Sequence, residues 1–319
     1  MPRILISDKL PATAIDILRA RGLEADYKPG LSPEEQAKII GEYEGLIVRS
    51  ATKLIGPVLE AAKKLKIVVR AGTGIDNIDK ARATEMNIVV ENTPGQNTVS
   101  TAEHAIALIM ALMRNIPQGT ASLKSGEWAK SKLEGREICG KTLGVLGMGN
   151  IGRVVADRAW GLKMNVIAFD PQMSSTAIRA MGVKAVSFDE LLAQSDIITI
   201  HVPLFPATKG LINADTIGKM RNGVYIIHEA RGGIVDEVAL LQALESGKVA
   251  GAALDVFLEE PVQPGNALVA HPKVICTPHL GASTKEAQDN CSVAAAEQLA
   301  AYFLEGRIVN AVNADKIKR

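Results

Sequence analysis

Short apolar runs rich in β-branched residues recur along the chain and alternate with amphipathic stretches. Runs that are apolar on both faces are typical of parallel strands covered by helices on each side. The alternation therefore predicts an α/β fold of doubly wound parallel sheets. The expected strands are Ile4–Ser7, Leu46–Arg49, Ile67–Ala71, Ile88–Glu91, Thr142–Gly147, Asn165–Phe169, Ile197–Val202, Val224–His228, Ala252–Val256 and Val274–Thr277. The expected helices include Pro57–Leu65, Asp189–Gln194 and Asp236–Glu245.

The length of 319 residues favours two domains over one. The α/β pattern is interrupted at 92–97 and again at 280–283, and a long helix is expected after each interruption. Both helices begin with the spacing of a capping box, Ser100 with Glu103 and Ser283 with Glu286. We interpret these loops as connections between two domains. The alternative, that both helices are ordinary core helices, fits the pattern nearly as well.

The expected strand 142–147 leads into Gly147-x-Gly149-x-x-Gly152 and then into a helical stretch. The first glycine permits a tight turn, the second lets the backbone approach a pyrophosphate, and the third allows the helix to pack closely on the strand. The N-terminus of that helix would offer N–H groups to the phosphates.

The next strand ends at Asp170, 18 residues after Gly152. A carboxylate at this place can accept hydrogen bonds from ribose hydroxyls and repel a 2′-phosphate. Because no arginine follows in Asp170-Pro171-Gln172, the motif predicts NAD rather than NADP. About 140 residues of α/β pattern precede the motif, so we expect the nucleotide domain to begin near residue 97.

Composition excludes several classes of partner. The charges nearly balance, with 36 basic and 35 acidic residues, which gives no support for nucleic acid or a membrane surface as a partner. Cys139, Cys276 and Cys291 lie far apart, which argues against disulfides and a zinc site, so we expect no metal. No apolar run is long enough for a signal peptide or a membrane span, and we expect a soluble cytoplasmic protein.

Hydride transfer from an alcohol to NAD leaves a proton that a base must take, and histidine is the usual choice. His104 lies in an apolar helix, where a core or interface role is simplest. His201 ends a strand and could flank the cofactor, and His271 lies in a loop. His279 follows a strand end, where parallel sheets place their ligands. Taken singly, each histidine fits a structural role better than a catalytic one.

A catalytic histidine benefits from a carboxylate that stabilises its imidazolium form. Asp255, Glu259 and Glu260 follow another strand end and are candidates. An anionic substrate needs a cation, and Arg231 follows a third strand end, where its guanidinium could grip carboxylate and carbonyl oxygens. Together, arginine, glutamate and histidine at three strand ends indicate a dehydrogenase.

The sequence resembles the D-isomer-specific 2-hydroxyacid dehydrogenase family. The matching segments are 70–79, 92–112, 140–153, 230–244, 251–261 and 278–288. The resemblance implies two Rossmann-like or flavodoxin-like domains, with a discontinuous substrate-binding domain at 1–96 and 283–319 around an NAD-binding Rossmann domain at 97–282. It also implies NAD-dependent oxidation of a 2-hydroxy acid to a 2-keto acid, and the segments at 49–53, 70–79 and 279–288 favour a phosphorylated substrate.

The resemblance implies roles for individual residues. Arg231 would bind the substrate, His279 would be the acid–base, and Glu260 would pair with it. The implied cofactor contacts are Gly147, Gly149, Asn150, Ile151, Gly152, Asp170, His201, Val202, Glu229, Ala230, Asp255, Leu280, Gly281 and Ala282. The implied substrate contacts are Arg49, Arg70, Thr73, Gly74 and Asn97. Arg49, Arg70 and Lys132 of the partner subunit are candidates for the substrate phosphate, and a surface or structural ion-pair role is an equal alternative for each.

Two departures from the family pattern stand out. The family commonly has Asn-x-x-Arg-Gly where this chain has His228-Glu229-Ala230-Arg231-Gly232, which puts an acid near the nicotinamide side. Longer members carry a C-terminal regulatory domain that binds serine, and we expect this chain to have neither that domain nor serine feedback.

The resemblance and the apolar helix 102–113 also predict a homodimer. Two alternative functions remain, a glyoxylate or hydroxypyruvate reductase and a non-catalytic NAD-sensing protein of the corepressor kind.

Overall fold

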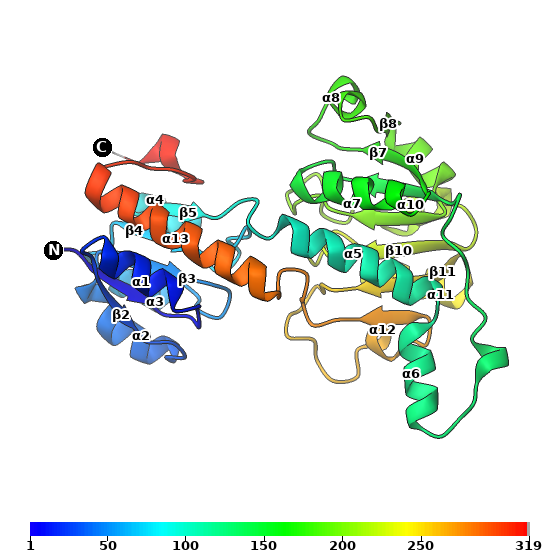
Figure 1. Ribbon diagram of the computed structural model, residues 1–319, viewed down its shortest axis with the longest axis horizontal. Helices are drawn as coiled ribbons and strands as arrows, with labels where there is room; N and C mark the ends of the chain where they lie inside the picture. Colours follow the sequence, from blue (N-terminus) through cyan, green and yellow to red (C-terminus); the bar gives the residue numbers. More distant parts are fainter. Residues whose placement is uncertain (318–319) are drawn as a thin grey trace. The chain divides into compact units, whose positions relative to one another are not determined.

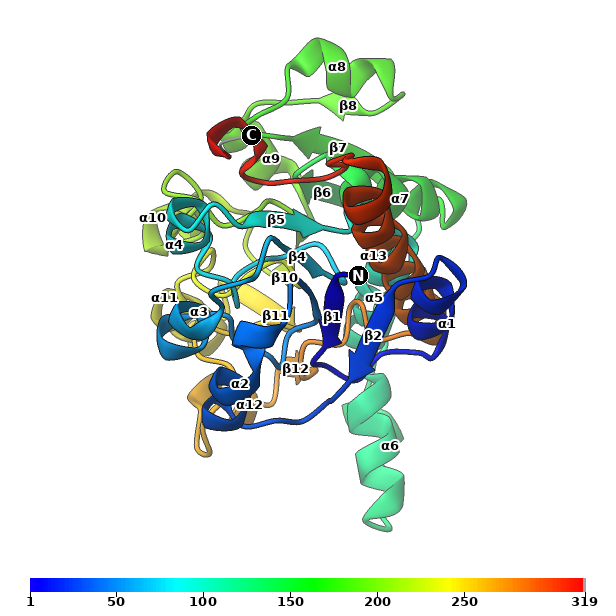
Figure 2. The same ribbon diagram turned by 90° about the vertical axis from the view of Figure 1, so that its left-hand side faces the viewer.

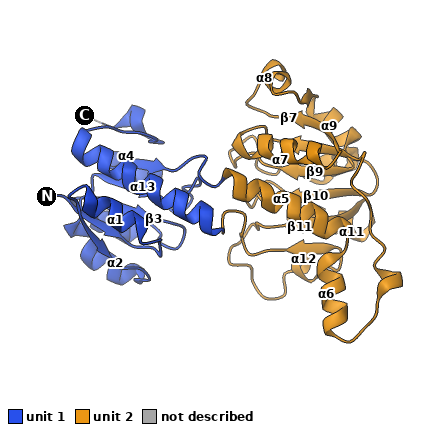
Figure 3. Cartoon of the chain, in the orientation of Figure 1, with its two compact units in different colours: residues 1–97, 284–319 blue, residues 98–283 orange. Residues whose placement is uncertain are grey.

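The computed structural model describes residues 1–317, and the chain divides into two compact units (Figure 3). Unit 1 consists of residues 1–97 and 284–319, and unit 2 consists of residues 98–283. Each unit is built on one parallel β-sheet with helices on both faces (Figure 1). The predicted fold class is therefore confirmed.

Unit 1 has a five-stranded sheet in the order β2-β1-β3-β4-β5, and all its neighbouring strands are parallel. The strands are β1 Arg3–Ile6, β2 Glu24–Tyr27, β3 Gly45–Val48, β4 Ile67–Arg70 and β5 Val89–Asn92. The helices are α1 Thr13–Ala20, α2 Pro33–Ile39, α3 Gly56–Ala61, α4 Lys80–Glu85 and α13 Lys285–Glu305.

Helices α1 and α13 cover one face of the unit 1 sheet, and α2, α3 and α4 cover the other (Figure 2). Alternation along the strands distributes the apolar side chains between these two faces. Ile4 and Ile6 of β1 pack in one core with α1 and α13, whereas Leu5 belongs to the other core with α3 and α4. Because the inner strands β1, β3 and β4 are buried on both sides, they appear in the sequence as continuous apolar runs rather than alternating ones.

The C-terminal segment returns to unit 1 through the buried Asn313. Its side-chain amide donates to the Ile88 carbonyl at 3.0 Å, and its Oδ1 accepts from Val90 N at 2.9 Å. These bonds fasten the segment to the edge strand β5, next to an antiparallel bridge between Glu91 and Ala311.

Unit 2 has a seven-stranded parallel sheet in the order β12-β11-β10-β9-β6-β7-β8. The strands are β6 Thr142–Leu146, β7 Asn165–Phe169, β8 Lys184–Ala185, β9 Ile197–Ile200, β10 Val224–His228, β11 Val249–Leu254 and β12 Val274–Cys276. The helices are α5 Thr98–Met113, α6 Ile116–Lys124, α7 Asn150–Gly161, α8 Ser175–Ala180, α9 Phe188–Gln194, α10 Ala214–Lys219, α11 Glu237–Glu245 and α12 Ala267–Ala270. The chain order reverses between β6 and β9, which is the topological switch point where open α/β sheets bind ligands.

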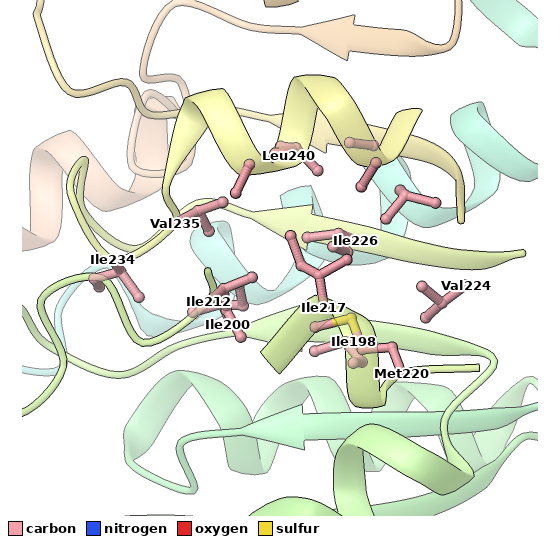
Figure 4. Close-up of a cluster of buried hydrophobic side chains, with 14 of the residues drawn as sticks. Ile198, Ile200, Ile212, Ile217, Met220, Val224, Ile226, Ile234, Val235 and Leu240 are labelled. Atoms are coloured by element: carbon pink, nitrogen blue, oxygen red, sulfur yellow. The ribbon is translucent and has the colours of Figure 1, made fainter. Parts of the chain in front are cut away.

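Two apolar cores hold the sheet of unit 2. On one face, Ile198 and Ile226 of the strands pack against Ile217 of α10 and Leu240 of α11 (Figure 4). On the other face, the sheet packs against α5 and α7.

Helix α5 is a core helix of unit 2. Ala102, Ala105, Leu108, Ile109 and Leu112 are buried in the core that it shares with α7 and the sheet. Burial within its own unit explains why α5 is so apolar, so its composition no longer supports a subunit contact. Within residues 1–317, no helix is long and apolar enough to cross a membrane.

Local details differ from the sequence expectations. The edge strands β2 and β8 were not predicted, because they are short and partly polar. Helix α5 begins at Thr98 rather than after Ser100, whose hydroxyl instead donates to the Gly281 carbonyl at 2.8 Å. Helix α13 is capped by Thr284 and not by Ser283. Sequence spacing finds a cap only to within a residue or two, because neighbouring hydroxyl residues can compete for the same role.

Candidate active site

The glycine motif forms the turn between β6 and α7. Gly147 has a φ of +101°, a backbone conformation that side chains rarely adopt. A Cβ on Gly152 would overlap the carbonyl oxygen of Gly147, whereas a Cβ on Gly149 would meet nothing within 4 Å. The first and third glycines are therefore required by the turn itself, and the second leaves open space beside the backbone.

The N-terminus of α7 fits a phosphate group. Its N-cap is Gly149, and among residues 1–317 no side chain caps the free N–H groups of the first turn. The side chain of Asn150 accepts from Arg153 Nη2 at 2.9 Å and so points to its own helix. Uncapped N–H groups at the positive end of a twelve-residue helix are the usual receptor for a pyrophosphate.

Asp170 follows β7 and braces the glycine turn. Its Oδ2 accepts from Met148 N at 2.7 Å, and its Oδ1 accepts from Gln172 N at 2.8 Å. These two bonds hold the carboxylate beside the turn, and each oxygen keeps a further lone pair for a ribose hydroxyl. The β6 and β7 ends therefore fit the adenosine half of NAD.

His279 and Glu260, which the sequence predicts to be an acid–base pair, lie within hydrogen-bond distance of one another. Nδ1 of His279 lies 2.7 Å from Oε2 of Glu260, and both side chains are partly exposed. Burial raises the pKa of Glu260, but hydrogen bonds from His279 and from Phe257 N outweigh it and hold the pKa below its usual value. An ionised Glu260 can therefore stabilise a proton on His279, leaving Nε2 to exchange protons with a substrate.

Asp255 holds the turn that carries His279. Its carboxylate accepts from Thr277 Oγ1 at 2.6 Å, Leu280 N at 2.7 Å and Gly281 N at 2.9 Å. His279 has a φ of +55°, an uncommon conformation for a residue with a side chain. The brace around Asp255 compensates for that strain, a structural role the sequence did not indicate.

Arg231 lies in the loop after β10, the neighbour of β11. Its Nη1 donates to the Ala230 carbonyl at 2.7 Å, and its own carbonyl accepts from Nε2 of His228 at 2.9 Å. Burial lowers the pKa of His228 to about 4, so this ring is neutral and acts as a hydrogen-bond donor. His228, one of the two departures from the family pattern, thus supports the Arg231 loop. Arg231, Glu260 and His279 follow the ends of β10, β11 and β12, three adjacent strands.

The side chain of Glu229, an implied cofactor contact, is fully buried. Its Oε2 lies 3.0 Å from Nδ1 of His104, and its Oε1 lies 3.8 Å from Nδ1 of His201. Nδ1 of His104 is also 3.9 Å from Oδ2 of Asp255. Sequence reasoning missed this cluster because its members are far apart in the chain. His104, Glu229 and Asp255 could hold a metal ion by type and spacing, but both oxygens of Asp255 already accept hydrogen bonds.

The other expected cofactor contacts also lie at this edge of the sheet. The side chain of His201 is almost completely buried and pairs with Thr199 Oγ1 at 2.8 Å, and the backbone of His201 lies beside Gly147. Val202 is buried, whereas Leu280 is 40% exposed. The predicted contacts of Ile151, Ala230 and Ala282 remain predictions.

In unit 1, the expected substrate residues lie at the carboxyl edge of its sheet. Val48, the last residue of β3, pairs with Arg70, the last residue of β4, so Arg49 and Arg70 lie at the ends of adjacent strands. Thr73 Oγ1 donates to Asn97 Oδ1 at 2.8 Å, and Gly74 follows in the same loop.

Asp8 supports the Arg49 loop and was missed by sequence reasoning. This buried carboxylate accepts from Arg49 N at 2.5 Å and from the backbone and hydroxyl of Thr52. Asp8 could have been found in the sequence as an acidic residue close after an apolar strand.

A dinucleotide turn and an acid–base pair on the carboxyl edge of one parallel sheet define a class of protein, the NAD-dependent dehydrogenases. The model of the D-isomer specific 2-hydroxyacid dehydrogenase NAD-binding domain matches residues 106–281. The chain belongs to this family, and unit 2 carries its NAD-binding domain.

The relatives include the D-3-phosphoglycerate dehydrogenase of Archaeoglobus fulgidus, which is 48% identical over 316 residues, covering 99% of this chain and 60% of the relative. Among solved structures, the TT0316 protein from Thermus thermophilus has a TM-score of 0.88 at 35% identity, covering 97% of this chain and 99% of that one. A glyoxylate reductase from Paecilomyes thermophila has a TM-score of 0.88 at 31% identity, covering 98% and 99%. The chain spans only 51–60% of the length of the curated relatives.

Proposed function

We propose that the protein oxidises the 2-hydroxyl of D-3-phosphoglycerate to the 2-keto acid with NAD as hydride acceptor. The observation that carries this proposal is the His279–Glu260 hydrogen bond of 2.7 Å, with Arg231 on the adjoining strand end. The substrate is suggested by relatives named D-3-phosphoglycerate dehydrogenase, including the Bacillus subtilis protein at 46% identity over 98% of this chain.

The chemistry follows from the chain's own side chains. His279 accepts the hydroxyl proton at Nε2, while Glu260 stabilises the resulting imidazolium through Nδ1. Arg231 orients the substrate carboxylate and polarises the forming carbonyl through its planar guanidinium. Bound NAD⁺ supplies the hydride acceptor. In the reverse direction, the protonated His279 returns its proton to the carbonyl oxygen.

Arg49 and Arg70 are our candidates for binding the substrate phosphate. Arg70 is the last residue of β4 and Arg49 follows the adjacent strand β3, and the backbone N–H groups of the Arg49 loop are fixed by the buried Asp8. Two guanidinium groups on neighbouring strand ends suit a dianionic phosphate. The reductases of glyoxylate and hydroxypyruvate need no such site, which separates the two functions.

We expect Arg49→Gln to reduce kcat/KM for 3-phosphoglycerate by about 100-fold, because one charge-assisted phosphate contact is lost. The measurement is NADH formation or loss with 3-phosphoglycerate, phosphohydroxypyruvate, hydroxypyruvate and glyoxylate. The exposed Lys53 of the same loop, changed to Gln, is the matched control and should leave these values near wild type. Equal wild-type rates with phosphorylated and unphosphorylated acids would refute the phosphate site and favour the reductase.

We also propose that the protein is a homodimer whose contact includes α6 and the segment after it. No residue of α6 is buried, and Ile116, Leu123 and Trp128 are 53%, 60% and 80% exposed. Apolar side chains gathered on one exposed segment are typical of a subunit contact. Lys132, whose side chain is 75% exposed and paired with Glu127, belongs to the same segment and is the candidate for reaching the partner's substrate.

We expect sedimentation of the wild-type protein at micromolar concentration to give a dimer and the Leu123→Ser, Trp128→Ser variant to give a monomer. Removing two large apolar side chains from a contact weakens it by several kcal/mol, while the folded units keep their cores. Circular dichroism should show unchanged secondary structure in the variant. A monomeric wild-type protein would rule out the dimer.

A further inference from the structure

The buried pair of Glu229 and His104 is not used by the mechanism above. Glu229 follows β10 and its side chain is completely buried, yet one of its oxygens, Oε1, has no hydrogen-bond partner among the described residues. The other oxygen lies 3.0 Å from Nδ1 of His104 on α5. An unsatisfied carboxylate oxygen in a protein interior is costly, and such groups are kept where their charge has a use.

The pair lies in the part of unit 2 that fits the nicotinamide half of the cofactor. Asp170 and the glycine turn follow β7 and β6, on one side of the switch point, whereas Glu229 follows β10 on the other side. Nδ1 of His104 is 3.9 Å from Asp255, and Asp255 accepts from the two N–H groups directly after His279. The pair is therefore close to the turn that carries the acid–base.

We propose that Glu229, hydrogen-bonded to His104, is a buried charge that makes the site prefer NAD⁺ over NADH. The nicotinamide ring carries a positive charge in NAD⁺ and none in NADH, so a nearby anion stabilises only the oxidised form. Glu229 thereby acts as a specificity-determining residue that favours the hydride-accepting cofactor. The inference rests on the NAD site of unit 2 and not on the substrate proposed above.

The groups around Glu229 predict how this preference varies with pH. Burial raises the pKa of Glu229 to about 7, even though the hydrogen bond from His104 lowers it. That same bond raises the pKa of His104, against the effect of burial. His201, which faces Glu229 from the end of β9, is neutral because burial lowers its pKa to about 3, and Asp255 faces the pair from the end of β11.

The sign of the pH effect follows from the charge of the pair. Whichever of Glu229 and His104 loses a proton, the cluster becomes more negative by one charge. As the pH rises through the pKa of Glu229, about 7, its carboxylate becomes charged and the preference for NAD⁺ becomes stronger. NAD⁺ should therefore bind more tightly from pH 6 to pH 8, whereas NADH should not. One unit charge inside a protein changes the affinity of a charged ligand by about tenfold.

The test is to measure the dissociation constants of NAD⁺ and NADH by calorimetry at pH 6, 7 and 8, with a chelator present so that no metal ion occupies the cluster. No hydroxy acid is present, so the result is independent of the proposed substrate. For the wild type, the ratio Kd(NADH)/Kd(NAD⁺) should rise about tenfold over this range. For Glu229→Gln, it should stay near the wild-type value at pH 6.

Two further variants sharpen the test. Glu245→Gln, on the exposed end of α11, is the matched control and should behave as wild type. His104→Asn removes the donor that lowers the pKa of Glu229, so the rise in the ratio should move to higher pH. A Glu229→Gln variant with the same pH-dependent ratio as wild type would overturn the proposal.

A second measurement tests the proposal even if the Glu229→Gln variant does not fold. The His279→Asn protein keeps Glu229, His104 and the buried His201 but lacks the partly exposed His279. In that protein at pH 7, NAD⁺ binding should release more protons than NADH binding, as measured by calorimetry in two buffers with different ionisation enthalpies. Equal proton release for the two cofactors would contradict the proposal.

Discussion

His279→Asn should reduce turnover with the proposed substrate, 3-phosphoglycerate, by about 10³-fold, because the variant lacks the proposed base for the hydroxyl proton. Asparagine is the best replacement, since residue 279 has a φ of +55° and asparagine tolerates this left-handed conformation better than alanine does. The backbone turn should then survive, and the dissociation constant of NAD⁺ should change by no more than about threefold. Steady-state kinetics and calorimetric NAD⁺ titration measure the two effects separately.

Glu260→Gln serves as the companion variant. It keeps a hydrogen-bond acceptor beside His279 but removes the negative charge that stabilises the imidazolium, so its turnover should lie between those of wild type and His279→Asn. Turnover of His279→Asn within about fivefold of wild type would remove His279 from the acid–base role.

Gly152→Ala should lower the stability of the protein by about 3 kcal/mol and its NAD⁺ affinity with it. The added Cβ would overlap the carbonyl oxygen of Gly147, which belongs to a backbone turn and cannot move away as a flexible side chain could. The helix α7 would have to shift from β6, and the phosphate-binding end of the helix would shift too. Thermal unfolding should show a decrease in Tm of about 6–12 °C.

Gly149→Ala is the matched control within the same motif. A Cβ there meets nothing within 4 Å, and the φ of −66° is accessible to alanine. We expect a Tm near wild type but weaker NAD⁺ binding, because the methyl group occupies space that the pyrophosphate needs. If both variants lost the same stability, the proposed difference between the second and third glycines would be wrong.

The fold class could be predicted from the sequence because parallel strands buried on both faces have a local signature. The run at 143–146 and the run at 224–227 are continuously apolar, and each is followed by a turn or loop and then a helix. The edge strands β2 and β8 lack that signature, since an edge needs fewer apolar residues, and they were missed.

The helix caps show the limit of local patterns. Ser283 and Thr284 are adjacent hydroxyl residues, and either could cap the following helix. The structure selects Thr284, whose hydroxyl oxygen accepts from Ala287 N at 3.1 Å. Ser100 likewise has the spacing of a cap but bonds to Gly281, 181 residues away. For Ser100, a contact with a distant part of the chain replaces the local cap.

The candidate site likewise contains residues that the sequence predicts and contacts that only the structure shows. Spacing along the chain and family resemblance predict the NAD turn, Asp170 and the set of Arg231, Glu260 and His279, because each lies at a strand end with recognisable chemistry. The brace of Asp255 around His279 and the pairing of Glu229 with His104 appear only in the folded chain. His104 and Glu229 are 125 residues apart, on a helix and a strand end that meet by packing, and no periodicity connects them. Local sequence patterns therefore established the NAD-binding dehydrogenase fold, while tertiary packing decided which buried charges surround the site and hence its proposed preference for NAD⁺.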